Sequence, residues 1–122
     1  MSEYHNPLRT THVLTTATLS TLAEIGKFSG PAGMQGRVES ISVLVSTATT
    51  AADCLVSLGD GTTLNKFGGV TVPVTSLNGV ANTLVSLTDD DNLIPADSMV
   101  TIETDGGCTA GAGTVTVVIA WF

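Results

Sequence analysis

The feature that most constrains the fold is a period of two in residues 37–47, RVESISVLVST. Its residues alternate along the chain, with Ile41, Val43 and Val45 on one parity and Ser40, Ser42, Leu44 and Ser46 on the other. Because successive side chains of a strand point to opposite faces, this pattern predicts a strand with one apolar face and one mostly polar face.

The same reasoning predicts further strands along most of the chain. They lie in residues 22–28, 53–58, 69–75, 82–88, 98–104 and 113–122, separated by turn signals such as Asp60-Gly61. Pro73 lacks an N–H donor, which places its strand at a sheet edge or at a bulge. The 20 Thr and 14 Val also favour strands. These observations predict an all-β antiparallel sandwich or barrel.

The N-terminal segment differs from the rest of the chain. Residues 1–16 are polar and show no sustained period, so they are predicted to be an extended N-terminal arm, with a single β-sandwich domain in residues 17–122. Residues 18–25 also fit a short helix that stops at Gly26, but we favour a strand there.

Charge narrows the classes of partner. The net charge is −7, and the four basic residues are scattered, which disfavours nucleic acid and anionic membrane surfaces as partners. The N-terminus lacks the pattern of a signal peptide, so synthesis in a cytoplasm is the expectation. Cys54 and Cys108 are therefore expected to be reduced thiols, although their spacing also permits a disulfide.

The acidic run Asp89, Asp90 and Asp91 is the strongest candidate for a metal site. Counted from Asp89, the positions of an EF-hand that need an oxygen ligand and a glycine hold Leu93 and Ile94, so that motif fails. We interpret the run as a solvated turn, with a looser calcium site that also uses Asp97 or a backbone carbonyl as the alternative, and we expect Leu93 and Ile94 to enter the core.

No catalytic constellation is apparent. His5 and His12 have no carboxylate at a useful spacing, and Cys108 lies in a glycine-rich turn without a nearby base. Trp121 is predicted to fill a core or an interface rather than to stack on a sugar. The prediction is a protein that is not an enzyme and has no cofactor and no metal.

Four segments carry a resemblance to a known family: EIGKFSGPAGMQGRVESISVLVSTATTAA, VSLGDGTTLNKFGGVTVP, DDDNLIPADSMVTIETDGG and AGAGTVTVVIAWF. Over residues 20–122 the chain resembles the capsid decoration, or cement, proteins of tailed bacteriophages. The resemblance implies a jelly-roll sandwich that assembles as a homotrimer on the capsid exterior of the virion. It further implies binding to the major capsid protein.

On this reading, two parts of the chain are candidate contacts with the capsid or with other subunits. They are the arm, through Tyr4, Leu8, Arg9, Val13 and Leu14, and the C-terminus, through Trp121 and Phe122. The alternative function is a receptor- or glycan-binding module of a phage tail or fibre. An enzyme on a jelly-roll scaffold is a third and weaker hypothesis.

Overall fold

The computed structural model describes residues 8–20, 22–63, 66–74, 81–83 and 93–122. All the regular structure in these residues is β-strand, and no helix long and apolar enough to cross a membrane occurs among them. The strands are β1 Leu8–Thr18, β2 Leu22–Ser29, β3 Gly36–Thr50, β4 Cys54–Gly59, β5 Gly68–Val72, β6 Ala81–Thr83, β7 Leu93–Ile94, β8 Met99–Asp105 and β9 Ala110–Trp121.

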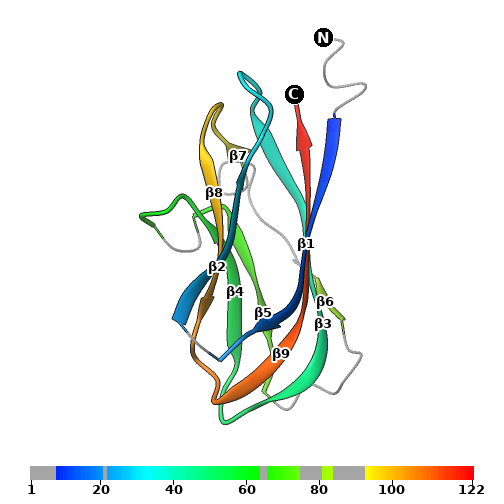
Figure 1. Ribbon diagram of the computed structural model, residues 1–122, viewed down its shortest axis with the longest axis vertical. Coiled ribbons are helices and arrows are strands. Elements are labelled where there is room, and N and C mark those ends of the chain that lie inside the picture. The colour runs from blue at the N-terminus through cyan, green and yellow to red at the C-terminus, as the bar shows by residue number, and fades with distance from the viewer. Residues whose placement is uncertain (1–7, 21, 64–65, 75–80, 84–92) are drawn as a thin grey trace.

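The strands form two antiparallel sheets that pack face to face (Figure 1). One sheet has the order β1-β9-β3-β6, with the short β7 also paired to β3, and the other has the order β2-β8-β4-β5. β1 pairs with β9, β2 with β8, β3 with β6 and β4 with β5. The chain therefore resembles one long hairpin that is folded over, so that its successive strand pairs lie in one sheet and then in the other. This is the strand order of a jelly roll, so the predicted sandwich and its jelly-roll type are confirmed.

The predicted period of two in residues 37–47 is confirmed in β3. Ile41 and Val43 are fully buried and lie opposite Val117 and Val115 of β9, which are also fully buried. Side chains directly opposite on antiparallel strands share a face, so these two strands supply a continuous apolar surface to the core. The second sheet meets it with Val56 and other buried residues.

Residues 22–29 form strand β2, as favoured over the helix. Gly26 is not a helix stop but lies within the strand, next to a register shift between Glu24 and Gly26. A Cβ atom on Gly26 would lie 3.0 Å from Cδ1 of Leu14, because β1 packs closely against this point. Gly26 therefore permits the close approach of the two sheets at their edge.

The predicted division into an arm and a domain is wrong for residues 8 to 16. These residues belong to β1, which pairs with β9 from Leu8 opposite Trp121 to Thr18 opposite Ala112. β1 is polar because it lies at the edge of its sheet, with one face in solvent. Residues 1–7 of the predicted arm lie outside the described residues.

The turns around β5 agree with their sequence signals. The Asp60 carboxylate accepts hydrogen bonds from the backbone N–H groups of Thr62 and Thr63, and Gly61 takes a positive φ of 93°. The N–H bonds from Thr63 and Thr62 lower the pKa of Asp60. Pro73 directly follows β5, which is an edge strand, as its missing donor predicted.

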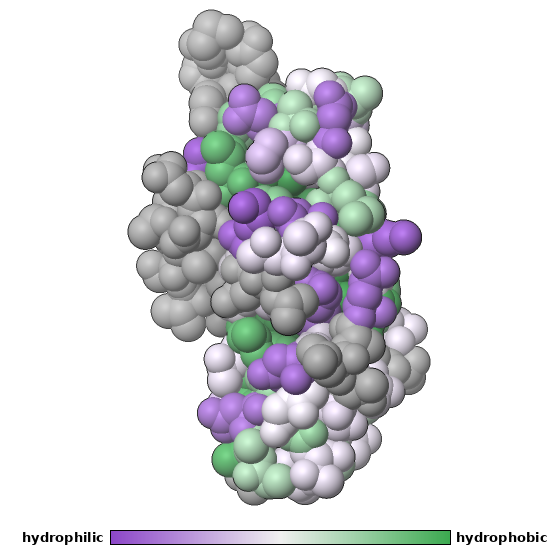
Figure 2. Space-filling view, turned by 90° about the vertical axis from the view of Figure 1, so that its left-hand side faces the viewer, coloured by the Kyte–Doolittle hydropathy of each residue, from purple (hydrophilic) through white to green (hydrophobic). Residues whose placement is uncertain are grey.

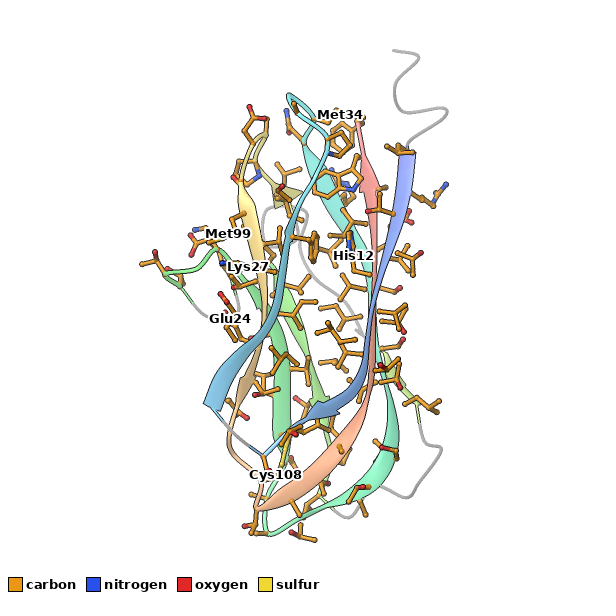
Figure 3. All side chains as sticks on the ribbon, in the orientation of Figure 1. His12, Glu24, Lys27, Met34, Met99 and Cys108 are labelled. Carbon is orange, nitrogen blue, oxygen red and sulfur yellow. A yellow bond between two sulfur atoms is a disulfide. The ribbon has the colours of Figure 1, made fainter. Side chains whose placement is uncertain are left out.

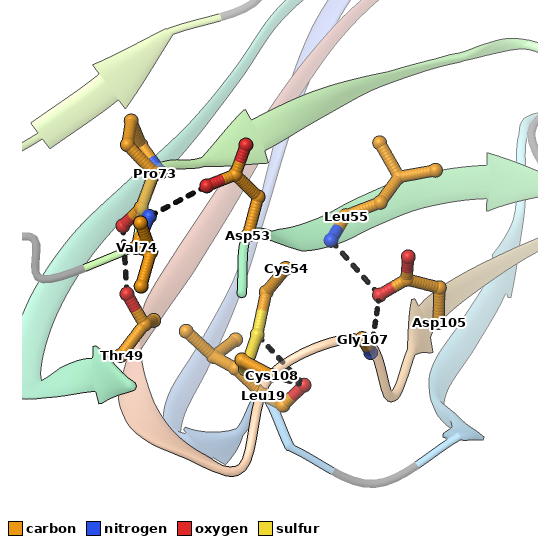
Figure 4. The surroundings of a disulfide bond; sticks show 10 residues. All are labelled: Leu19, Thr49, Asp53, Cys54, Leu55, Pro73, Val74, Asp105, Gly107 and Cys108. Carbon is orange, nitrogen blue, oxygen red and sulfur yellow. Dashed lines mark hydrogen bonds between the residues drawn. A yellow bond between two sulfur atoms is a disulfide. The ribbon is translucent and has the colours of Figure 1, made fainter. Parts of the chain in front are cut away.

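Cys54 and Cys108 form a disulfide, so the expectation of two reduced thiols is wrong (Figure 4). Both side chains are buried. The bridge joins the start of β4 to the turn between β8 and β9 and thereby ties the two sheets together at one end. The carbonyl oxygen of Leu19 lies 3.3 Å from Sγ of Cys54.

Candidate protein interface

Trp121 lies at the opposite end of the sandwich from the disulfide and is 1% exposed. Its ring packs directly over Gly30 and Gly36, where any Cβ atom would collide with it. Its indole Nε1 donates a hydrogen bond of 2.7 Å to Oγ1 of Thr10. Trp121 thus fills the core, one of the two roles predicted for it, and its buried ring leaves no face free for a sugar.

Phe122 is held by its backbone. Its N–H donates to the carbonyl oxygen of Gln35, and Gln35 N–H donates back to the Phe122 carbonyl oxygen, both at 2.9 Å. The Phe122 residue is only partly buried. Of the two predicted C-terminal contact residues, Phe122 therefore retains exposed surface and Trp121 does not.

Arg9 is exposed on β1 and forms an ion pair with Glu39 of β3. The guanidinium donates from Nε at 2.7 Å and from its terminal nitrogen at 3.1 Å to the two carboxylate oxygens. This fork of two hydrogen bonds and the Glu39 charge raise the pKa of Arg9. Because β9 lies between β1 and β3, this ion pair connects the two strands on either side of β9.

Three rows of the outer face of the β1-β9-β3 sheet carry no charged side chain, whereas the next row places Arg9 and Arg37 on either side of Ala120. The register places Thr11 beside Val118 and Ser40, Val13 beside Thr116 and Ser42, and Thr114 beside Leu44. Val13 and Leu44 are 51% and 50% exposed. We call these eight residues the neutral face: Thr11, Val13, Ser40, Ser42, Leu44, Thr114, Thr116 and Val118.

The predicted contact residues of the arm fall into three groups. Leu8, Arg9 and Val13 are exposed on β1, with Leu8 at 50%. Leu14 is partly buried and packs against the core, so it turns away from the neutral face. Tyr4 lies outside the described residues.

His12 faces the space between the sheets (Figure 3). Its ring stacks on Phe28 of β2, with a centroid distance of 3.7 Å and an interplanar angle of 11°. Nε2 lies 3.1 Å from Oγ1 of Thr10. Burial lowers the pKa of His12, because desolvation disfavours the charged imidazolium. The histidine therefore joins the two sheets by packing.

The described residues contain no group of three or more His, Cys, Asp or Glu side chains arranged to hold a metal. The acidic run Asp89, Asp90 and Asp91 lies outside these residues, whereas the core position predicted for Ile94 is confirmed. Asp97, which follows the run, accepts a hydrogen bond of 2.9 Å from the backbone N–H of Gly33. Its carboxylate thus joins two loops.

Of the eight residues of the neutral face, only Val13 was predicted as a contact, and Leu44 is the exposed large apolar residue among the other seven. It stands on the polar parity of β3 between Ser42 and Ser46, so its exposure follows from the alternation itself. A large apolar side chain on the solvent parity of a regular strand is the signal that identifies such a position.

No protein-family model and no curated protein sequence matches the chain. Among solved structures, its fold is similar to that of a chain from the capsid of Ralstonia phage GP4. That match has a TM-score of 0.51 and 12% identity, over 95% of this chain and 83% of the other. A chain from the acidic stable capsid of Helicobacter pylori bacteriophage KHP30 aligns with a TM-score of 0.40 and 19% identity, over 93% and 94% of the two chains. The first of these similarities shows that the jelly-roll fold of this chain is shared with a phage capsid structure.

Proposed function

We propose that this protein is a structural component of a phage virion and acts as a decoration protein on the outside of the capsid. The observation that carries the proposal is the jelly-roll fold shared with a chain of the Ralstonia phage GP4 capsid over 95% of this chain. The resemblance of residues 20–122 to decoration proteins supports the same conclusion. The role is one of binding and not of catalysis.

The charge of the protein supports an exterior position. Packaged DNA is a dense polyanion, so a protein with a net charge of −7 is repelled from the inside of a filled capsid. On the outside, the same charge keeps the particles apart in solution.

The neutral face is the surface that we propose for contact with the major capsid protein. Burying a charged side chain has a desolvation cost of several kcal/mol unless it is paired, and the eight residues of this face include none. Val13 and Leu44 provide exposed apolar area on this face. Arg9, paired with Glu39, lies next to this face on β1, whereas Leu8 is opposite the buried Trp121 and therefore belongs to the other side of the strand. If the protein assembles as a homotrimer, we place the contacts between its subunits on other surfaces, so that the neutral face contacts the capsid subunit.

Substitutions on the two sheets test the proposal. The protein is mixed with capsids of its phage that lack it, and the bound fraction is measured after sedimentation. Leu44→Lys places a charge on the neutral face and is expected to reduce the bound fraction at least tenfold. Met99→Lys is the matched control, because Met99 is also apolar and 42% exposed but lies on β8 of the other sheet.

Both variants are expected to keep the wild-type melting temperature within a few degrees, since each changes an exposed position. Equal binding by the Leu44→Lys variant and the wild type would remove the neutral face from the proposal. Failure of the wild type itself to sediment with the capsids would refute the decoration function.

A further inference from the structure

The outer face of the second sheet is partly covered by the loop that joins β4 to β5. Thr101 on β8 alternates with the core residues Val100 and Ile102, so its side chain points outward, yet it is fully buried. A Cβ atom on Gly61 of this loop would lie only 2.5 Å from Cε of Met99. The start of the loop therefore lies close over β8.

Three oxygen atoms converge beneath this loop, beside Gly59. The position that a Cβ atom would take on Gly59 lies 2.5 Å from the carbonyl oxygen of Thr63 and 3.2 Å from Oγ1 of Thr101. Oε1 of Glu103 is closer still to that position. The oxygens come from a carboxylate, a backbone carbonyl and a hydroxyl, and the glycine leaves the space between them free of a side chain.

These three oxygens do not form hydrogen bonds with one another. Oγ1 of Thr101 and Oε1 of Glu103 are both buried and have no hydrogen-bond partner among the described residues. An ionised carboxylate and a backbone carbonyl only accept hydrogen bonds, so Glu103 and Thr63 cannot pair directly. Leaving a buried polar atom without a partner is costly, and the cost is larger for a charged group. Oγ1 of Thr101 and Oε1 of Glu103 are therefore left without a partner, whereas the Thr63 carbonyl accepts a hydrogen bond of 3.4 Å from the Asp60 N–H.

The surrounding side chains add negative charge on one side. Glu24 of β2 lies directly opposite Glu103, and two carboxylates in such a pair repel each other. Lys27 lies opposite Thr101, and the Lys66 charge acts on Asp60, which also belongs to the loop. Among the described residues, no ion pair joins Lys27 or Lys66 to Glu103. Figure 3 shows Glu24 and Lys27 on this side of the molecule, and Figure 2 shows separate hydrophilic groups among neutral and hydrophobic residues on the same face.

We propose that this cluster binds a calcium ion. Ca²⁺ accepts carboxylate, carbonyl and other oxygen ligands at about 2.3–2.6 Å in a flexible geometry, and water completes its shell. Glu103, Thr63 and Thr101 would provide the protein ligands, and the ion would offset the repulsion between Glu24 and Glu103. By joining β8 to the β4–β5 loop, the ion would stabilise this loop on the sheet. This inference is independent of the proposed function, because it concerns the isolated protein.

Calorimetry and thermal unfolding of the full chain test the proposal. Titration with CaCl₂ is expected to release heat with a stoichiometry of one. At a Ca²⁺ concentration about 100 times the Kd, the melting temperature is expected to rise by about 10 °C relative to the protein in chelator. NaCl at equal ionic strength controls for screening.

The variant Glu103→Gln distinguishes a bound ion from a structural role of the side chain. Its amide can donate a hydrogen bond to the Thr63 carbonyl and removes the repulsion with Glu24. We therefore expect this variant to be at least as stable as the wild type in chelator but less stable than the wild type in Ca²⁺. Glu39→Gln, which removes a carboxylate from the other sheet, is expected to retain the Ca²⁺ response.

Several results would overturn the proposal. One is the absence of both calorimetric heat and a thermal shift at millimolar Ca²⁺. Another is a Ca²⁺ response that Glu103→Gln leaves unchanged. A third is a response that survives Glu103→Gln but is lost when Asp89, Asp90 and Asp91 are all changed to Asn, because the acidic run would then hold the ion.

Discussion

Reduction of the Cys54–Cys108 disulfide is expected to lower the free energy of unfolding by about 4 kcal/mol. The bridge closes a loop with a sequence separation of 54 residues, and the chain-entropy relation for a loop of this length gives that value at 25 °C. The folded state is expected to survive, because the carbonyl oxygen of Leu19, at 3.3 Å and 3.7 Å from the two sulfurs, can accept a hydrogen bond from either thiol. The loss is a large part of the 5–15 kcal/mol that is usual for a domain.

Trp121 makes this prediction easy to measure. It is the only tryptophan, and it is buried, so its fluorescence reports unfolding in urea with and without reductant. The double variant Cys54→Ala/Cys108→Ala is the control, and reductant should not alter its unfolding curve. A change below 1 kcal/mol in the wild type, or two free thiols in the purified oxidised protein, would refute the reasoning.

Three further substitutions test the packing between the sheets by the same unfolding assay. Gly30→Ala pushes a methyl group into the Trp121 ring and should cost about 1–3 kcal/mol, and an unchanged stability would contradict that contact. Thr10→Val leaves the Trp121 indole N–H without its acceptor and should cost about 1–3 kcal/mol, whereas Thr10→Ser should restore most of it. The lowered pKa of His12 means that the unfolded chain binds more protons, so stability should fall as the pH drops below about 6.5. His12→Gln should flatten this dependence between pH 7 and pH 5, and an equal slope in the variant would exclude His12 as its source.

The period of two identified the strands that lie in the core. In β3 and β8 one face is buried and the other faces solvent or a loop, and such strands alternate visibly in sequence. The turn Asp60-Gly61 was also predictable, because the carboxylate and the positive φ act within a few residues. Local interactions therefore account for most of the predicted elements.

The features that sequence did not predict depend on distant partners. β1 is rich in threonine and pairs with β9, about a hundred residues away, which no local pattern encodes. β9 has β1 at one edge and β3 at the other, and the pairing at each edge joins segments that are far apart in the sequence. The disulfide depends likewise on the meeting of two loops, of which Thr109 N–H to Thr50 C=O is a direct contact. The β1–β9 pairing and the disulfide both depend on which segments meet in the folded protein, and the spacing of residues along the sequence does not determine this.

The two outer faces of the sandwich differ in charge, and this difference leads to a final prediction. The neutral face has no ionisable side chain, whereas the outward positions of β2 and β8 include Glu24, Lys27, Glu103 and Asp105. Burying the neutral face against a capsid subunit removes no charge from water, so salt screens little of the binding free energy. Capsid binding is therefore expected to change by less than threefold between 50 mM and 500 mM NaCl. A fall of tenfold or more would instead assign the contact to charged residues such as Arg9, and the Leu44→Lys variant would then bind like the wild type.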